Sequence, residues 1–437
     1  MHPPKHTLSD SIGPERLVLM LHVVGAFTFT VLIGTPIAFA LIFSGLTYLL
    51  ATGAYPSTLS SYLFSTLNSS ALLSIPFFIL SAEILNHSGA TKRLVTMVDA
   101  WVGHNRGGLP VVAVITVAFF SAICGSSAAT AAAIGSVMIP EMVERGYDKR
   151  FTVGLIATAG GLGILIPPSI PLIIYGMITE ISIDRLFKAA MLPGICLATI
   201  LGVVAYFIGR RSGVAPSPRR SWAYRMNETR QAGGVLLMPV IILGGINTGL
   251  FTATESAAIA CVYALGLAVV VFRVRFGEIP RMLTGSASTA AMILLILAAA
   301  NLFSYALTSE RVPHAIFEFL TRMQMDRWQL LMMLMLFFIV AGMFLEVISI
   351  ILITMPILLP VLTAAEINPV HFAILLVVNM ELAVITPPIG LNLFVISAIS
   401  KVPVLDVFRG TLPFALVLVL FLLGLMYMPG AGWLMGG

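Results

Sequence analysis

Charge is scarce in this chain of 437 residues, because Asp, Glu, Lys and Arg together make up only 10% of it. Soluble domains carry about 25% charged residues, so the chain lies outside that class. Hydrophobic residues make up 59%, and a single soluble core stops growing near about 250–300 residues. The composition therefore predicts an all-α polytopic membrane protein. The net charge of +5 is spread over short loops, so a nucleic-acid partner is not expected.

Cysteine and enzyme motifs are also sparse. The three cysteines, Cys124, Cys196 and Cys261, lie in apolar stretches without CxxC spacing, so we interpret them as packing residues. No Walker A sequence, GxSxG or HExxH occurs, and neither an enzyme nor a bound cofactor is expected. Any work done by this protein must draw on an ion gradient or on another subunit.

Apolar runs long enough to cross a bilayer, about 20 residues each, recur along the chain. After a polar N-terminal tail at 1–16, which has no A-x-A cleavage site, the sequence predicts ten spans, at 17–33, 36–52, 71–87, 151–179, 186–209, 233–248, 255–272, 282–306, 371–399 and 411–428. Two further apolar regions, 109–143 and 329–361, are interrupted midway. Each is either two full spans or a re-entrant hairpin, and their short arms and equivalent flanks favour the hairpin.

The positive charges agree with two re-entrant hairpins. One side of the membrane then receives 17 Lys and Arg and the other side 7, which assigns the first side to the cytoplasm. The richer side holds the loops 88–108, 144–150, 210–231, 273–281 and 400–409. The segment 210–231 is predicted to be a basic cytoplasmic linker between two halves, and a contact with lipid headgroups there is an open alternative to simple charge anchoring.

The two halves, 17–209 and 232–437, match at an offset of 220 residues. Pro140 then falls on Pro360, Pro167-Pro168 on Pro387-Pro388, and Leu192-Pro193 on Leu412-Pro413. Prolines are poor helix-interior residues, so this coincidence indicates a repeat. Each half then has five crossings plus one hairpin. Because five is an odd number, the second half starts on the opposite side of the membrane and is inserted upside down. The sequence thus predicts an inverted repeat, which is typical of secondary transporters.

Each half contains one span that is broken in its middle by a Pro-Pro pair, within 151–179 and within 371–399. A Pro-Pro pair removes two N–H donors, and the carbonyls so freed must face a protein-lined cavity, where they can bind a cation. Pairing each break with a hairpin tip predicts two binding sites. The candidate substrate- and ion-binding residues are Gly125, Ser126, Ser127, Gly161, Gly163 and Pro167 in the first half, and Glu346, Ser349, Thr386 and Pro387 in the second. The plainer interpretation is that these Pro and Gly residues only kink packed helices.

Acidic residues inside apolar spans need separate interpretation, because ionisable groups are costly there. Glu346 and Glu381 fall in the second candidate site, where they could bind an ion or shape the tip. Glu83 and Glu255 are expected instead to bond to backbone or to neighbouring helices.

Six stretches of the chain resemble a known family, the large membrane subunit of tripartite ATP-independent periplasmic (TRAP) transporters, of the C4-dicarboxylate permease type. They are SIPFFILSAEIL at 74–85, CGSSAATAAAIGSVMIPEM at 124–142, GGLGILIPPSIPLIIYG at 160–176, GGINTGLFTATESAA at 244–258, GMFLE at 342–346 and NMELAVITPPIGLNLFV at 379–395. With their flanks they cover about residues 70 to 413, and the ordered set is highly specific.

The resemblance implies a multi-pass protein of the bacterial inner membrane with the elevator-type fold of the ion-transporter superfamily. It implies sodium-coupled uptake of a small organic acid, a separate four-helix small membrane subunit, and a periplasmic substrate-binding protein. The family's sodium-binding elements correspond here to Ser126, Ser127, Gly161, Gly163, Ser349, Thr386 and Pro387. A stand-alone ion-coupled permease for dicarboxylate or citrate is the alternative function.

Overall fold

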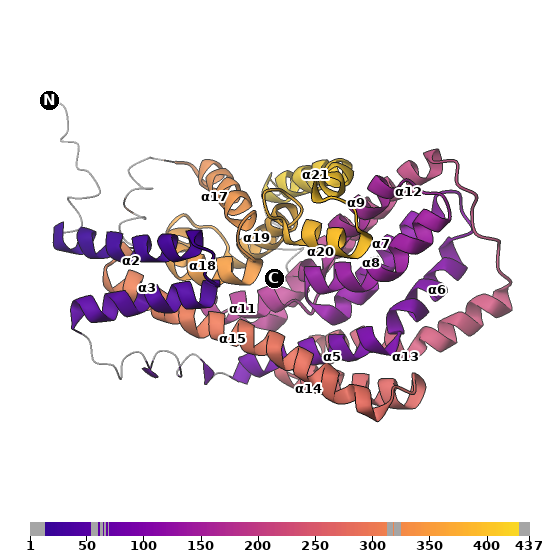
Figure 1. The fold of residues 1–437 in the computed structure, drawn as a ribbon, viewed down its shortest axis with the longest axis horizontal. Helices are drawn as coiled ribbons and strands as arrows, with labels where there is room; N and C mark the ends of the chain where they lie inside the picture. The colour runs from indigo at the N-terminus through magenta and orange to yellow at the C-terminus, as the bar shows by residue number, and fades with distance from the viewer. Residues whose placement is uncertain are drawn as a thin grey trace.

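The computed structural model describes residues 14–53, 60–61, 64, 67–68, 70–312, 318 and 325–427, and every regular element in that part is helical. Most helices run along the long axis of the molecule, as expected for a bundle that crosses a bilayer (Figure 1). The predicted all-α polytopic class is confirmed. Of the predicted polar tail 1–16, residues 1–13 lie outside the described residues, and the first helix begins at Pro14.

The first half contains α2 (Pro14–Leu32), α3 (Ile37–Thr52), α5 (Ser74–Ser88), α6 (Ala90–Val102), α7 (Gly108–Cys124), α8 (Ser127–Glu144), α9 (Lys149–Ala159), α10 (Leu162–Leu165), α11 (Ile170–Thr179) and α12 (Ile183–Arg211). The second half contains α13 (Trp222–Asn247), α14 (Ala253–Gly266), α15 (Ile279–Ser309), α17 (Arg327–Gly342), α18 (Val347–Ala364), α19 (Pro369–Ala383), α20 (Leu391–Ser400) and α21 (Val404–Tyr427). A π-helical turn extends α14 to Val271, and short 3₁₀ turns lie at Ser70–Leu73 and Phe276–Glu278.

The broken spans lie where the sequence predicts them. The span at 151–179 is divided into α9, α10 and α11, and the span at 371–399 is divided into α19 and α20. The interrupted region 109–143 is the helix pair α7 and α8, and 329–361 is the pair α17 and α18. Among the described residues, seven helical segments are long and apolar enough to cross a membrane, and α18 is one of them. Length alone therefore leaves open whether the second pair is a hairpin or two spans.

The helices form two groups that meet where α15 contacts α18 and where α5 and α6 contact α7. In the first group α15 packs on α3 and α5, α5 packs on α14, and α13 packs on α6 and α14. In the second group α7 packs on α8 and α12, α9 on α21, and α17 on α19. Figure 1 shows α15 running diagonally below α11 and α18, and α15 also contacts α18. The long α15 thus forms one edge between the groups, and α5 and α6 form another with α7.

The connection between the halves is shorter than predicted. The expected linker 210–231 is extended only between Arg211 and Trp222, because α13 already begins at Trp222. The Trp101 ring of α6 lies edge-on to Trp222 with ring centroids 5.3 Å apart, and Trp101 Nε1 donates to Thr229 Oγ1 at 2.9 Å. The basic segment was predicted to be a loop because of its charge, but Ser221 caps a helix there by accepting from the Tyr224 N–H at 3.2 Å, and that helix packs on α6.

Ser217, in the middle of this connection, holds it against both groups of helices. Its hydroxyl donates to Asp99 Oδ1 at 2.9 Å and accepts from Arg145 Nη1, and its backbone N–H donates to the Gly103 carbonyl at 3.0 Å. Asp99 lies on α6, whereas Arg145 lies in the turn after α8. The connection between the halves is therefore fixed to two elements of the first half.

Candidate functional site

The first tip, between α7 and α8, is a tight turn made by Gly125 and Ser126. Gly125 has φ +69°, a left-handed conformation that glycine adopts without steric cost, and its N–H donates back to the Ser121 carbonyl at 3.3 Å. Ser126 is extended and begins α8, while the hydroxyl of Ser127 is buried. The local sequence thus places two hydroxyls and a glycine at a helix N-terminus, where partial positive charge gathers.

The first break separates α10 from α11 at Pro167-Pro168, a cis peptide bond. Neither proline has an N–H, so the carbonyls of Gly163 and Ile164 lose their usual helical donors. The Ser169 hydroxyl replaces one of these donors, because it donates to the Ile164 carbonyl at 2.5 Å. The Gly163 carbonyl has no such substitute from Ser169, so it is the oxygen that the break frees.

The first tip and the first break are in direct contact. The N–H of Ile170, at the start of α11, donates to the Gly125 carbonyl at 3.2 Å. A Cβ on Gly125 would lie 2.9 Å from the Pro168 carbonyl oxygen, and a Cβ on Gly163 would lie 2.6 Å from that of Ser126. Only glycine permits these approaches, so backbone oxygens of the tip and the break converge.

The second tip, between α17 and α18, docks on the second break in the same manner. The N–H groups of Ile389 and Gly390 donate to the Met343 carbonyl at 3.2 and 3.4 Å. A Cβ on Gly342 would lie 2.5 Å from Cβ of Ala383, at the end of α19. The break itself contains a second cis pair, Pro387-Pro388. In both halves, therefore, the carbonyl of a tip accepts from backbone N–H groups at or just before the start of the helix that follows the Pro-Pro pair, which is α11 in the first half and α20 in the second.

The side chains predicted for the second site lie beside this junction. Glu346 begins α18 in an extended conformation, and its Oε1 accepts from the buried Ser349 hydroxyl at 3.5 Å. The Thr386 hydroxyl donates to the Leu382 carbonyl at 2.6 Å, which leaves its oxygen lone pairs available to a cation. Pro387 is half-buried at the same turn.

Two residues predicted for the first site point toward the second half. A Cβ on Gly161 would lie 3.0 Å from Cγ of Glu381, so Gly161 faces α19 and not the first tip. The Ser127 hydroxyl lies 3.3 Å from Oδ1 of Asn392 on α20. The structure therefore brings Gly125, Ser126, Gly163 and Pro167 together, and it uses Gly161 and Ser127 to join the two sites.

Both junctions open onto one cavity of about 400 Å³. The tips contribute Gly125–Ser127 and Glu346–Ile348, and the half-helices contribute Ile170, Pro171, Val384 and Leu391. The opposite wall comes from α5, with Ile79, Ala82, Glu83 and Asn86, and from α15, with Thr289, Met292 and Ile293. Two helix groups thus enclose a mainly apolar space with a few polar groups, the usual character of a small-molecule site.

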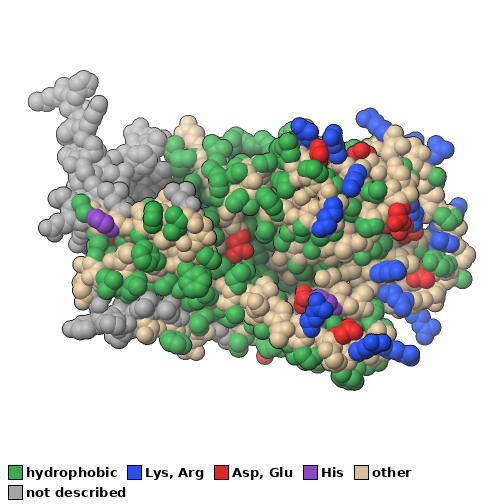
Figure 2. All heavy atoms as spheres, in the orientation of Figure 1, with side chains coloured by type: hydrophobic (Ala, Val, Ile, Leu, Met, Phe, Trp, Pro, Cys, Tyr) green, Lys and Arg blue, Asp and Glu red, His purple; other side chains and the backbone are tan. Residues whose placement is uncertain are grey.

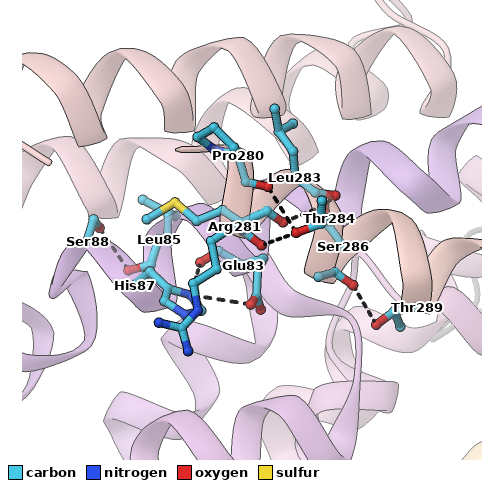
Figure 3. A network of polar contacts seen from close by, with 12 residues as sticks. Glu83, Leu85, His87, Ser88, Pro280, Arg281, Leu283, Thr284, Ser286 and Thr289 are labelled. Carbon is cyan, nitrogen blue, oxygen red and sulfur yellow. Dashed lines mark hydrogen bonds and ion pairs between the residues drawn. The ribbon is translucent and has the colours of Figure 1, made fainter. Parts of the chain in front are cut away.

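Glu83 faces the α15 wall of this cavity. Figure 3 shows Glu83 and His87 on one helix opposite the turns of α15 that carry Thr284, Ser286 and Thr289. Glu83 Oε1 lies 3.3 Å from His87 Nδ1, and a Cβ on Gly285 would lie 3.5 Å from the same oxygen. The Glu83 carboxylate is thus paired with His87 on its own helix, which differs from the predicted bonding to backbone or to a neighbouring helix.

Glu255, the other acid expected to bond to backbone or to a neighbouring helix, does bond to backbone. Its Oε2 accepts from the Thr252 backbone N–H at 2.8 Å and completes a capping box at the start of α14.

Sequence reasoning missed Asn392 and underrated Glu381. Asn392 is fully buried, its Nδ2 donates to the Ala157 carbonyl at 3.1 Å, and its backbone N–H donates to the Val384 carbonyl at 3.1 Å. Glu381 is also fully buried, and within the described part of the chain neither of its carboxylate oxygens has a hydrogen-bond partner. An amide two residues after a Pro-Pro-Ile-Gly break in an apolar span is the signal that could have identified Asn392.

The site offers oxygen ligands of the kind that hard cations prefer. Backbone carbonyls, Ser and Thr hydroxyls and carboxylates converge at the two junctions, whereas soft ligands are few, with the buried Cys124 beside the first tip. The starts of α8, α11, α18 and α20 also face the cavity and present partial positive charge. Such an arrangement can hold a cation beside an anionic solute.

Comparisons with known proteins agree with this geometry. Residues 24–431 match the family model described as the tripartite ATP-independent periplasmic transporter, DctM component. The chain is 42% identical over 385 residues to a C4-dicarboxylate TRAP transporter large permease protein of Pseudomonas aeruginosa, covering 88% of this chain and 90% of that one. It is 37% identical over 425 residues to the protein of the same name from Rhodobacter capsulatus, covering 94% and 97%.

Two further comparisons concern chain length and fold. An isethionate TRAP transporter permease protein of Oleidesulfovibrio alaskensis is 34% identical over 425 residues, which cover 97% of this chain but 66% of that one. Among solved structures, the YdaH transporter of Alcanivorax borkumensis superposes with a TM-score of 0.65 and 14% identity, covering 97% of this chain and 99% of that one. At that identity the likeness concerns the fold alone.

Proposed function

Because this chain belongs to the DctM component family of the tripartite ATP-independent periplasmic transporters, we propose that it couples the uptake of a small organic acid to sodium entry by an elevator motion. The chain is a large permease subunit of this class, a multi-pass inner-membrane secondary transporter that works with a periplasmic binding protein, and it is not an enzyme. The observation that carries the proposal is the single cavity where both tips and both broken helices meet.

Sodium coupling is supported by the chemistry of the two junctions. Each Pro-Pro pair frees backbone carbonyls inside the protein, and unwound carbonyls of this kind hold sodium in secondary transporters. In the first junction Ser126 and Gly163 would contribute oxygens, with Ser127 and Gly161 at its border with the second half. In the second junction Ser349, Thr386 and the backbone around Pro387 would do so, beside Glu346.

The proposed elevator moves the group that carries the tips along α15. Two upside-down copies, each with five spans and one re-entrant hairpin, would let the halves exchange conformations and expose the site to either side in turn. The equivalent docking of each tip on its own break supports this repeat. Because α15 contacts α18, α15 is the fixed helix along which the tips would slide.

Two cavities along this edge support a path for the tips. The first cavity reaches Glu83 and Asn86, near the end of α5 that leads into the predicted basic loop 88–108, most of which is the helix α6. A second cavity of about 470 Å³ lies farther along α15, at Asn301 and Ser304, and along α18. In the proposed topology the described conformation therefore faces the cytoplasm, and the second cavity marks the way to the exterior.

The substrate class and the partners follow the relatives. The two relatives named above that share 42% and 37% identity with this chain are named for C4-dicarboxylates, so we take these acids as the first candidates. A four-helix small membrane subunit is the proposed membrane partner, and the longer isethionate relative, named DctMQ, supports a second membrane component. Family membership also argues against the stand-alone permease, because this transporter class works with a binding protein.

The direct test is reconstitution of the full chain with a candidate small subunit in proteoliposomes, with a binding protein added outside. Uptake of a labelled C4-dicarboxylate should require an inward sodium gradient and the binding protein. Uptake that stays equal when potassium replaces sodium would refute sodium coupling. Uptake without the binding protein would instead support the alternative function, a stand-alone permease.

A further inference from the structure

A second groove, separate from the transport cavity, lies between α7 and α12. Its volume is about 690 Å³, and its walls are almost entirely apolar. Val114, Ala118 and Phe119 line it from α7, and Ile195, Gly202 and Val203 line it from α12. An apolar space of this size does not hold ordered water, because water needs polar partners. In a bilayer the chemistry that fits such a groove is a hydrocarbon chain.

One end of the groove is polar and carries unpaired positive charge. Asn105 and Tyr206 close this end, next to Arg106, Arg210 and Arg211. All three arginines are exposed, and none of them forms an ion pair with another residue that the structure describes. Figure 2 shows that Lys and Arg gather at the end of the molecule where α6, α12 and α13 lie.

The loop and the helix that carry these arginines are held together. Gly107 packs so closely on α12 that a Cβ there would lie 2.7 Å from the Tyr206 carbonyl oxygen and 2.7 Å from the Arg210 backbone nitrogen. Gly209 packs in turn on Pro110, where a Cβ would lie 2.7 Å from the proline Cγ. The basic cluster is therefore fixed at the mouth of the groove.

We infer that this groove is a binding site for an anionic phospholipid, with an acyl chain between α7 and α12 and the headgroup phosphate at Arg106, Arg210 and Arg211. Basic pockets between membrane helices recognise anionic headgroups in this manner. The apolar groove holds the chain, while the arginines select the headgroup. Since α7 leads into the first tip, the lipid would pack directly on a helix of the transport site.

The test is native mass spectrometry of the purified full-length chain, offered phosphatidylglycerol and phosphatidylcholine at equal mole fraction. Wild-type protein should retain phosphatidylglycerol preferentially. Replacing Arg106, Arg210 and Arg211 by Gln one at a time should lower this retention about fivefold each, because a basic residue near an anionic surface contributes about that factor. Removing one charge at a time at Arg273, Arg275 and Arg281 is the matched control, because these arginines are exposed and lie between α14 and the first turn of α15, helices that do not line the groove.

A second variant tests the acyl-chain part of the site. Around Gly202 the groove is open, since the nearest atom to an added Cβ would be Val114 Cγ1 at 4.0 Å. Gly202→Phe should fill the groove and remove retention of phosphatidylglycerol, whereas Gly266→Phe, on an open face of the protein, should not. Equal retention of both lipids by wild-type protein, or equal losses in the groove and control variants, would overturn the inference.

Discussion

Gly161 of the first broken helix lies directly against Glu381 of the second, with only 3.0 Å between an ideal glycine Cβ and Cγ of the glutamate. The contact brings a fully buried carboxylate of one half to the break of the other half. Within the described chain, neither carboxylate oxygen has a hydrogen-bond partner. A buried polar group without a partner costs about 1–3 kcal/mol, so its retention points to a ligand.

Glu381→Met should therefore stabilise the fold while it impairs transport. Removing an unpartnered carboxylate should raise the free energy of unfolding by about 1–3 kcal/mol, because Met fills similar volume without polar atoms. Sodium-driven uptake should fall to background. Thermal unfolding in detergent and uptake in proteoliposomes measure the two effects. Glu255→Gln, which alters an exposed capping box, is the control and should leave uptake unchanged. Full uptake by Glu381→Met would show that the carboxylate has no role in coupling.

Ser126→Ala and Thr386→Ala should each weaken apparent sodium affinity by roughly two- to tenfold, as expected when one oxygen partner is lost. Both proteins should remain folded, since Ser126 is half-buried and, among the described residues, the Thr386 hydroxyl bonds only to the Leu382 carbonyl at the end of α19. The sodium dependence of uptake gives the measurement. Thr284→Ala removes the same kind of hydroxyl–backbone bond on α15 and should have no effect. Unchanged sodium dependence in both site variants would refute the ligand assignment.

Gly163→Ala should separate the first tip from its break. The added Cβ would lie 2.6 Å from the Ser126 carbonyl oxygen and 2.7 Å from Thr130 Oγ1, so backbone has to shift. Overpacking of this kind costs about 1–3 kcal/mol. Uptake should be lost even at temperatures where circular dichroism shows intact helices. Gly266→Ala, where no atom lies within 4 Å, should keep full activity, and equal activity in both variants would contradict the docking of tip and break.

Ser304→Trp should block the proposed motion without disturbing the fold. Ser304 lines the second cavity beside α18, so the indole has room in the described conformation but would obstruct the travel of the tips along α15. Uptake should stop, while sodium binding, followed by protection against thermal unfolding, should persist. Val262→Trp, which is 73% exposed, is the control. Normal uptake by Ser304→Trp would exclude this path.

Periodic and local signals made much of the fold predictable from the sequence. Each Pro-Pro pair breaks its span because the chemistry of proline is local, and Gly125 turns the tip for an equally local reason. The start of α13 was missed although its signal is local, because Ser221 is an N-cap whose hydroxyl accepts from the Tyr224 N–H. By contrast, the sequence could not show that Gly161 and Ser127 face the second half. Contacts between distant segments decide those orientations, and no local pattern encodes them.

The reach of Asn392 to the Ala157 carbonyl, across 235 positions of sequence, also bears on how the chain matures. When the first half leaves the ribosome, that inward-facing carbonyl has no native partner until α20 has been synthesised. The newly inserted helices of the first half therefore lack part of their native packing until the second half has been inserted. Separately expressed halves should be short-lived in the cell, and they should become durable only when both are produced together.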